Sequence, residues 1–157
     1  HYILKYWNLI WNQLIRRFNG SVKTKIHGKN ILVNIGYTYP IYIKRFPKLN
    51  SPLVELVYQA SKNSNSNLVV FDIGAAIGDT ALLINETCGD KIEKLICIDG
   101  DEEFSYYLNQ NIQSLLYAEA FFTILSSKGN EVNSLVRTHS GTASSQGKNK
   151  SRSQTLV

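Results

Sequence analysis

The spacing of hydrophobic residues changes several times along this chain. Between residues 3 and 18 apolar side chains recur every three or four positions, which predicts an amphipathic helix that ends at Asn19-Gly20. Its stripe consists of Ile3, Trp7, Ile10, Leu14 and Phe18. Two interpretations stay open. The helix packs on its own domain or a partner subunit, or it lies in a membrane interface, where Trp and Arg are favoured.

The next segments combine an extended pattern with a short helical one. Residues 31 to 46 alternate apolar and polar side chains and, after Pro40, continue with the apolar residues 41 to 43. This pattern predicts a β-hairpin or two short strands. Residues 52 to 60 favour a short helix, followed by a Ser- and Asn-rich loop at 61 to 67. The apolar face of that helix is expected to contain Leu53, Leu56, Val57 and Ala60.

Strands and helices then alternate regularly. Residues 68 to 73 form an apolar run broken only by Asp72, which is typical of a strand buried on both faces. A helix is expected from about Gly78 to Thr87, with Gly89 as its C-terminal cap, and residues 94 to 98 predict a second strand.

The alternation continues to about residue 125. Asp101 is placed to cap another helix, and residues 118 to 125 are a third candidate strand. The buried stripe of that helix is expected to contain Phe104, Leu108, Asn111, Ile112 and Leu115. The order β-α-β-α-β predicts a parallel sheet with right-handed crossovers. Residues 126 to 157 are mostly polar and are expected to form a long exposed loop or frayed hairpin that leads to a missing fourth strand.

Composition narrows the class of protein only slightly. The chain has 157 residues, is 43% hydrophobic and carries a net charge of +5, which suits one domain and permits an anionic partner without selecting one. Its two cysteines have no neighbouring Cys or His, so no metal site is expected. No apolar run reaches the roughly 18 residues of a spanning helix. We expect a cytoplasmic protein, with residues 1–18 as the segment for peripheral membrane contact or self-association.

A glycine turn carries the first chemical signal. The strand predicted at 68–73 ends in Asp72-Ile73-Gly74, and the next helix begins near Gly78. Glycine permits a sharp turn and the close approach of a ligand, and the free N–H groups of a helix start attract anionic groups. The Gly-x-x-x-Gly spacing differs from the Gly-x-Gly-x-x-Gly of dinucleotide sites, which argues against NAD. An ordinary tight turn is the alternative.

An acidic residue at the end of the next strand carries the second signal. Asp99 follows Asp72 by 27 positions and ends the run Leu95 to Ile98. A carboxylate at that edge of a parallel sheet faces the ligand crevice, where it can accept both hydroxyl protons of a ribose. In the alternative, Asp99 only starts a turn and Asp101 only caps a helix.

These two segments resemble the FkbM family of S-adenosylmethionine-dependent methyltransferases. Residues 71–81 are similar to the family's D-I-G-A-N-I-G-D-T motif, and residues 98–104 to its E-P-D-P turn. The helix that follows ends in residues 108–112, similar to the family's L-x-x-N-I. The resemblance extends over about residues 68 to 125. Ala76 departs from the family's Asn, and Asp99-Gly100 departs from its Glu-Pro.

The resemblance implies a fold, a cofactor and a set of binding residues. The fold is an α/β, Rossmann-like class I methyltransferase sheet, incomplete here and preceded by an amphipathic helix and a β-hairpin. The cofactor is S-adenosylmethionine. Four residues would surround its methionine end, two would lie at the helix start, one would take the ribose hydroxyls and two would border the adenine. In that order they are Asp72, Gly74, Ala75, Gly78, Asp79, Thr80, Asp99, Gly100 and Asp101.

The resemblance also implies O-methylation of a hydroxyl on a sugar or polyketide-type product, with a small molecule or glycan as acceptor. No catalytic base is identified, because His27 and His139 are expected in loops as solvated side chains. Tyr37, Tyr39 and Tyr42 are able to stack on a sugar, but tyrosines are also ordinary on a half-exposed strand.

Two other functions stay open. A nucleic-acid methyltransferase is permitted by the positive charge, although no basic and aromatic cluster outside residues 1–18 supports a nucleic-acid partner. A truncated, non-catalytic fragment that binds a cofactor or partner is the other alternative, because the chain begins with His1 and only three core strands are found before residue 126. The chain is expected to consist of an amphipathic helix at 1–20, a hairpin and short helix at 21–67, a cofactor-binding core at 68–125 and a polar loop or hairpin at 126–157. The strand expected at 68–73 should have one unpaired edge.

Overall fold

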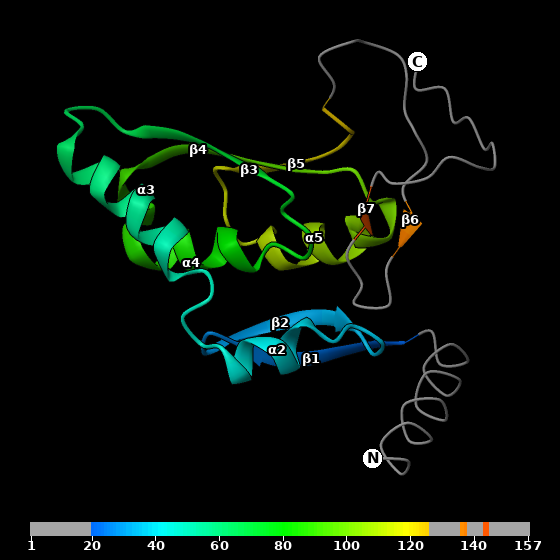
Figure 1. Ribbon diagram of the computed structural model, residues 1–157. Helices are drawn as coiled ribbons and strands as arrows, with labels where there is room; N and C mark the ends of the chain where they lie inside the picture. Colours follow the sequence, from blue (N-terminus) through cyan, green and yellow to red (C-terminus); the bar gives the residue numbers. More distant parts are fainter. Residues whose placement is uncertain (1–19, 126–135, 138–142, 145–157) are drawn as a thin grey trace.

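The computed structural model describes residues 20–125, 136–137 and 143–144, and these residues form three layers (Figure 1). A parallel sheet is the first layer, three helices form the middle layer, and a β-hairpin with a short helix forms the third. The helix expected at residues 3–18 and His139 lie outside the described residues.

The hairpin consists of β1 (Ser21–Ile26) and β2 (Lys29–Asn34), which pair antiparallel with Ile26 opposite Lys29. The two residues between the strands, His27 and Gly28, have φ values of 49° and 80°. Positive φ at both central positions is the requirement of a type I′ turn, whose twist matches that of the paired strands. A hairpin was expected in this region, but its first strand lies ten residues earlier in the chain than the alternating pattern indicated.

The expectation of a strand at residues 41 to 43 is wrong. These residues belong to helix α2 (Tyr39–Arg45), in which Pro40 occupies the first turn and Ile43 is buried. Proline is favoured there because its missing N–H has no partner in the first turn and its φ is already helical. The run Ile41-Tyr42-Ile43 is too short for its period to distinguish a strand from a helix.

Helix α3 (Ser51–Asn63) confirms the helix expected at 52–60, but it buries a different face. Val54 and Ser61 are buried, whereas Leu53 and Leu56 are 49% and 72% exposed. The spacing of Val54, Val57 and Ser61 follows one helical stripe, and this stripe faces the core shared with α4.

The parallel sheet confirms the predicted β-α-β-α-β order. Its strands β3 (Leu68–Ile73), β4 (Ile92–Asp99) and β5 (Ala118–Phe122) lie in the order β3-β4-β5. The connections contain α4 (Asp79–Cys88) with the 3-10 turn η1 (Gly89–Lys91), and the 3-10 turn η2 (Glu102–Phe104) with α5 (Ser105–Ile112). The chain is therefore a mixed α/β protein in which helices cover a three-stranded parallel sheet.

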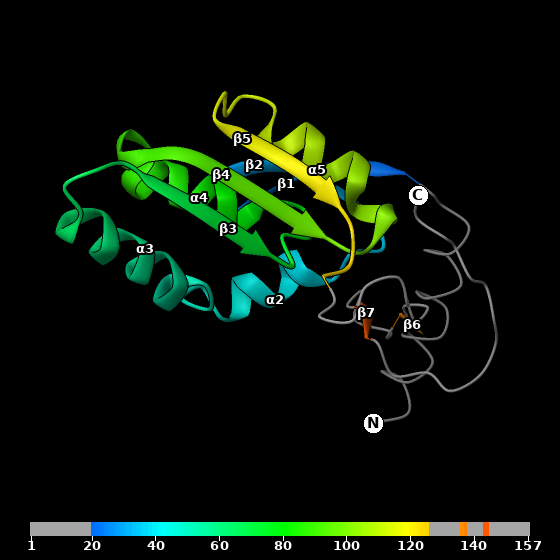
Figure 2. The same ribbon diagram turned by 90° about the horizontal axis from the view of Figure 1, so that it is seen from above.

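The expectation that residues 68–73 are buried on both faces is wrong. Helices α3, α4 and α5 lie on one side of the sheet, and no described element covers the other side (Figure 2). Val69, Phe71 and Ile73 point to that open side and are 50%, 60% and 66% exposed. Within the described part of the chain, β3 also pairs with β4 alone, so its outer edge is unpaired, as expected.

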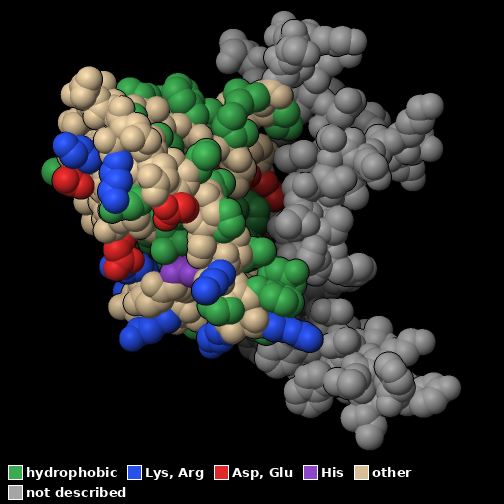
Figure 3. Space-filling model, turned by 60° about the vertical axis from the view of Figure 1, so that its left-hand side comes forward, with side chains coloured by type: hydrophobic (Ala, Val, Ile, Leu, Met, Phe, Trp, Pro, Cys, Tyr) green, Lys and Arg blue, Asp and Glu red, His purple; other side chains and the backbone are tan. Residues whose placement is uncertain are grey.

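Two hydrophobic cores hold the layers together. The main core lies between the sheet and the helices and includes Ala81, Ile84, Leu95, Cys97 and Leu108. The second core joins the hairpin layer to the glycine turn and consists of Ile26, Ile31, Val33, Ile43 and Ile77. Figure 3 shows hydrophobic side chains along the top of the molecule, where the sheet lies, and Lys and Arg mostly along the bottom, at the hairpin.

In the polar segment after residue 125, two short strands, β6 (Val136–Arg137) and β7 (Ala143–Ser144), pair antiparallel. None of the described helices has the length and apolar character needed to cross a bilayer.

Candidate functional site

The loop from β3 to α4 is a tight turn with three left-handed residues. Gly74, Ala76 and Gly78 have φ values of 85°, 45° and 83°. The amides of Gly74 and Ala75 donate to the carbonyl oxygen of Ile98 at 2.8 and 3.1 Å, so the turn is fastened to the end of β4. Glycine adopts positive φ without steric cost, whereas Ala76 is strained there. Asn tolerates this conformation better than Ala, so an asparagine at position 76 would be less strained than the alanine is.

Asp99 links the two motifs found in the sequence. It is the last residue of β4 and is 9% exposed. Its Oδ2 accepts a hydrogen bond from the Ala76 amide at 2.8 Å, and its Oδ1 accepts one from the Asp101 amide at 2.8 Å. The carboxylate therefore holds both the glycine turn and the acidic turn. A carboxylate has about four lone-pair sites, so these two bonds leave acceptor capacity.

Asp79 begins α4 and is held by the hairpin layer. Its Oδ2 accepts hydrogen bonds from the Tyr39 hydroxyl and the Asn50 amide, both at 2.9 Å, and it is 5% exposed. Burial raises the pKa of the Asp79 carboxyl, and the bond from Tyr39 opposes that rise. Burial and the nearby Asp79 charge also raise the pKa of Tyr39, whose hydroxyl stays protonated and able to donate. Asp79 thus fixes α2 to the start of α4.

Asp72 lies one residue before the end of β3 and has the least satisfied carboxylate of the site. Its Oδ2 is buried and has no hydrogen-bond partner among the described residues. Burial, followed by the charges of Asp79 and Asp99, raises the pKa of Asp72 from 3.8 to about 6. The charges of Asp79 and Asp99 therefore act on Asp72 at this edge of the sheet. The described residues contain no group of three His, Cys, Asp or Glu side chains placed to hold a metal ion.

The nine residues predicted to bind the cofactor all lie at this edge of the sheet, but not all present a side chain to a ligand. Ala75 is 3% exposed, and Asp79 is occupied by Tyr39 and Asn50. Gly100 follows β4, and the Oδ1 of Asp101 accepts from the Glu103 amide at 3.1 Å, which confirms the predicted cap. That cap begins the 3-10 turn η2, which leads into α5.

Gly78 was expected to allow the close approach of a ligand and a helix, and the structure shows the contact with a helix. A Cβ on Gly78 would lie 2.9 Å from Ile112 Cγ2 and 2.9 Å from Leu108 Cδ1, both on α5. The residue therefore permits α4 and α5 to approach closely. On Gly74, in contrast, a Cβ would meet nothing within 4 Å. The open position in the turn is Gly74, whereas Gly78 contacts α5, and the approach of a ligand to Gly78 stays a prediction.

Asn111 is a structural residue whose role only the tertiary contacts reveal. Its Oδ1 accepts from the Leu32 amide at 2.8 Å, and its Nδ2 donates to the carbonyl oxygens of Leu32 and Ile77 at 3.0 and 2.8 Å. One side chain thus connects α5, the hairpin and the glycine turn. The sequence placed Asn111 on the buried stripe of its helix, and that polar residue on an apolar stripe was the signal.

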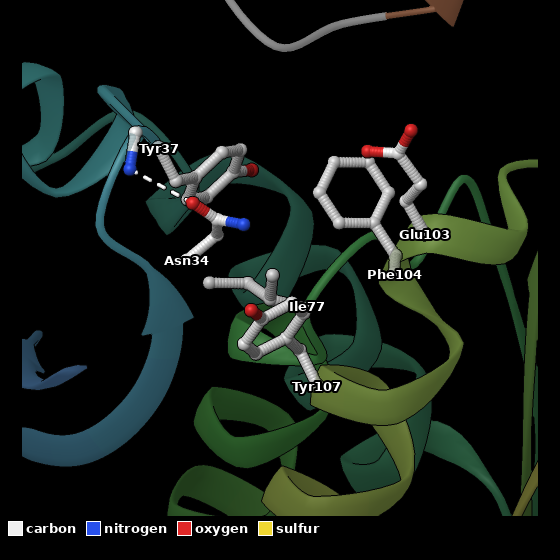
Figure 4. A pocket seen from close by; sticks show the side chains of 7 residues that line it. Asn34, Tyr37, Ile77, Glu103, Phe104 and Tyr107 are labelled. Atoms are coloured by element: carbon white, nitrogen blue, oxygen red, sulfur yellow. Dashed lines mark hydrogen bonds between the residues drawn. The ribbon is translucent and has the colours of Figure 1, made fainter. Parts of the chain in front are cut away.

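A pocket of about 170 Å³ lies beside the glycine turn, between the hairpin layer and the start of α5 (Figure 4). It is lined by Asn34, Gly36, Tyr37, Ile77, Glu103, Phe104 and Tyr107. Of the three tyrosines considered for stacking, only Tyr37 lines it, because Tyr39 is bonded to Asp79 and Tyr42 is exposed on α2 against Phe46. Phe104 and Tyr107 are the aromatic residues that sequence reasoning missed.

The expectation of a solvated His27 is wrong. The hairpin turn holds this residue so that its Nε2 is buried, and no described residue forms a hydrogen bond with it. His27 suits the first central position of the type I′ turn, because His tolerates positive φ better than most residues do.

No protein-family model matches the chain, and no curated protein matches it either. A functional proposal therefore starts from the geometry at the carboxyl ends of β3 and β4.

Proposed function

We propose that this chain is the S-adenosylmethionine-binding part of a Rossmann-like class I methyltransferase that methylates a hydroxyl of a small molecule or glycan. The observation that carries the proposal is the junction of Asp99 with the glycine turn. A glycine-containing turn after one parallel strand and an acid after the next, held against each other, form the arrangement at which α/β sheets bind nucleoside-containing ligands.

The charges at this edge favour a cationic ligand. Asp72 and Asp99 come from neighbouring strands, and Asp72 Oδ2 is a buried acceptor that no residue in the described part of the chain bonds. S-adenosylmethionine carries a sulfonium and an ammonium group, so its positive charge suits two carboxylates better than the pyrophosphate of NAD would. Asp72 would face the positive end of the cofactor, and the remaining acceptor capacity of Asp99 would take the ribose hydroxyls.

The bound cofactor would supply an activated methyl group, which a nucleophile takes in one in-line displacement. The chain itself would mainly bind and orient, because alignment is what such a transfer requires. A hydroxyl acceptor also needs a base to remove its proton. Burial and the nearby Asp79 carboxylate raise the pKa values of Tyr37 and Tyr39, so both hydroxyls stay protonated. Neither tyrosine is therefore suited to be that base.

Calorimetry with S-adenosylhomocysteine and S-adenosylmethionine tests the proposal. We expect both to bind, and Asp99→Asn to weaken binding about ten-fold or more, because a charge-assisted hydrogen bond contributes roughly 1.5–3 kcal/mol. The asparagine keeps one oxygen for the turn, and unfolding of the variant followed in parallel separates lost binding from lost structure. Glu119→Gln, an exposed carboxylate on β5, is the control.

Tighter binding of NADH than of S-adenosylhomocysteine would reject the proposal. Equal affinity of the folded Asp99→Asn variant and the original chain would reject the role given to Asp99. Cofactor binding with no methyl transfer to any hydroxyl acceptor would support the alternative of a non-catalytic binding fragment.

A further inference from the structure

The pocket beside the glycine turn is built from aromatic rings that come from separate segments. Tyr37 precedes α2, Phe104 ends η2 and Tyr107 lies on α5, and the three rings surround the same space with Ile77 at its base (Figure 4). The rings of Tyr37 and Phe104 are inclined by 69° with their centroids 5.5 Å apart. Two ring planes at such an angle form a corner, and one group in that corner can lie within about 6 Å of both centroids, which is cation–π range.

Among the described residues, the charged groups that line this corner or act on Tyr37 are carboxylates. Glu103 is the charged residue among those that line the pocket. Asp79 and Asp99 lie close enough to Tyr37 that both help to raise the pKa of its hydroxyl, although burial is the larger cause. Aromatic faces are themselves electronegative. Rings, carboxylate and the local field therefore all favour a positive group over a neutral or anionic one.

The size of the pocket limits what it can hold. A cavity of about 150 Å³ takes one benzene molecule, and this pocket measures about 170 Å³. A trimethylammonium group is comparable in size to a benzene ring and therefore fits this pocket.

We propose that this pocket is a binding site for an alkylated ammonium group, with Tyr37, Phe104 and Tyr107 as its aromatic walls and Glu103 as its counter-charge. The site is separate from the cofactor crevice and does not depend on it. Ile77 belongs to the glycine turn and Glu103 follows Asp101 by two residues, so a ligand anchored here would extend toward the crevice. A cationic group on an acceptor molecule would thus be held beside the place where the methyl donor is proposed to bind.

The test uses two probes that differ only in charge, choline and its neutral carbon isostere 3,3-dimethyl-1-butanol, titrated into the full chain and followed by ligand-observed NMR. We expect choline to bind at least ten-fold more tightly, because each ring adds about two- to five-fold for a cation and little for the isostere. Phe104→Leu and Glu103→Gln should each weaken choline binding several-fold. Tyr42→Leu, an exposed aromatic residue outside the pocket, should leave it unchanged.

Each remaining outcome bears on the proposal. Equal binding of the two probes, or no choline binding at tens of millimolar, would overturn it. Because the Glu103 side chain is exposed and its variant should fold normally, unchanged choline affinity in Glu103→Gln would remove the counter-charge and overturn it as stated. Choline binding that persists at saturating S-adenosylhomocysteine supports a separate site, whereas mutual exclusion would place the cation in the crevice and overturn it. Failure of the cofactor to bind, with choline still bound, would reject the methyltransferase proposal alone.

Discussion

Asp72 is the residue whose surroundings least suit its charge. Its carboxyl lies near the end of β3, and one of its oxygens is buried without a hydrogen bond from any residue that the structure describes. Burial and two neighbouring carboxylates raise its pKa to about 6. In an unfolded chain the same group titrates near 4. The folded protein therefore holds this proton more tightly than the unfolded chain does, and the stability of the fold must depend on pH in that interval.

The sign of this dependence gives a prediction at the residue scale. As pH rises from about 4 to about 6, the original chain should lose stability, because ionised Asp72 is disfavoured in the folded state alone. Asp72→Asn removes the ionisation and should stabilise the fold at pH 7 by about 2 kcal/mol, on the scale of 1.36 kcal/mol for each pKa unit. The gain should vanish below pH 4. Urea unfolding at pH 4, 6 and 7 measures it.

Asp90→Asn is the matched control, since this side chain is exposed and a neutral replacement should not alter the pH dependence. A gain in Asp72→Asn that is as large at pH 4 as at pH 7 would show that shape, not charge, causes it. A loss of stability at pH 7 would contradict the burial argument.

At the scale of elements, helix α4 is positioned by contacts at its first turn. Gly78 brings it against α5, Asp79 ties it to α2 through Tyr39, and Asn111 of α5 reaches the Ile77 carbonyl just before it. The glycine turn and the start of α4 are therefore held by contacts with α5, with α2 and, through Asn111, with the hairpin. The turn is therefore part of the packing between layers as well as a candidate ligand loop.

The two glycines of the turn allow a comparison that separates packing from backbone strain. Gly74 and Gly78 have nearly equal φ values, but only Gly78 contacts α5. Gly74→Ala should destabilise the fold by about 1–2 kcal/mol, the cost of a left-handed alanine. Gly78→Ala should cost a further 1–3 kcal/mol, roughly, because its Cβ overlaps the buried side chains of Leu108 and Ile112. Denaturant unfolding of both variants measures the difference, and equal losses would mean that α5 moves away without cost.

For the whole molecule, the distribution of exposed apolar surface is uneven. The sheet face away from the helices exposes Val69, Phe71 and Ile73 of β3 together with Phe121 of β5. The outer edge of β3 has no partner among the described residues. Contiguous apolar patches and unpaired edges both promote association with other chains.

We therefore expect self-association to depend on this face. Phe71→Lys should lower the average mass measured by sedimentation velocity at micromolar concentration, without loss of thermal stability, because the side chain is 60% exposed. Tyr106→Lys changes an aromatic residue that is 55% exposed on α5, away from the sheet, and should leave the mass unchanged. If both variants sediment like the original chain, this face does not mediate association.

The order and type of the elements from residue 68 to residue 122 were predictable from local sequence patterns. The same patterns placed Asp72, Gly74, Gly78 and Asp99 at one edge of the sheet. These features depend on local periodicity, on glycine and on the rule that parallel strands end at the same edge, so they are readable without tertiary contacts. The helix at 39–45 was missed because three apolar residues in a row have no readable period, and Pro40 fits either a turn or a helix start.

Only the tertiary structure decided which faces are buried and which polar groups meet. The stripe of α3, the open face of β3 and the bonds of Asn111 depend on how layers stack. Stacking is set by contacts between residues far apart in the chain, such as Leu32 and Asn111, which are 79 positions apart. The same holds for the aromatic pocket, whose walls come from three segments that no local pattern connects. Periodicity shows which residues share an apolar face of a helix or strand, but the residues that this face contacts are fixed only when the whole chain packs.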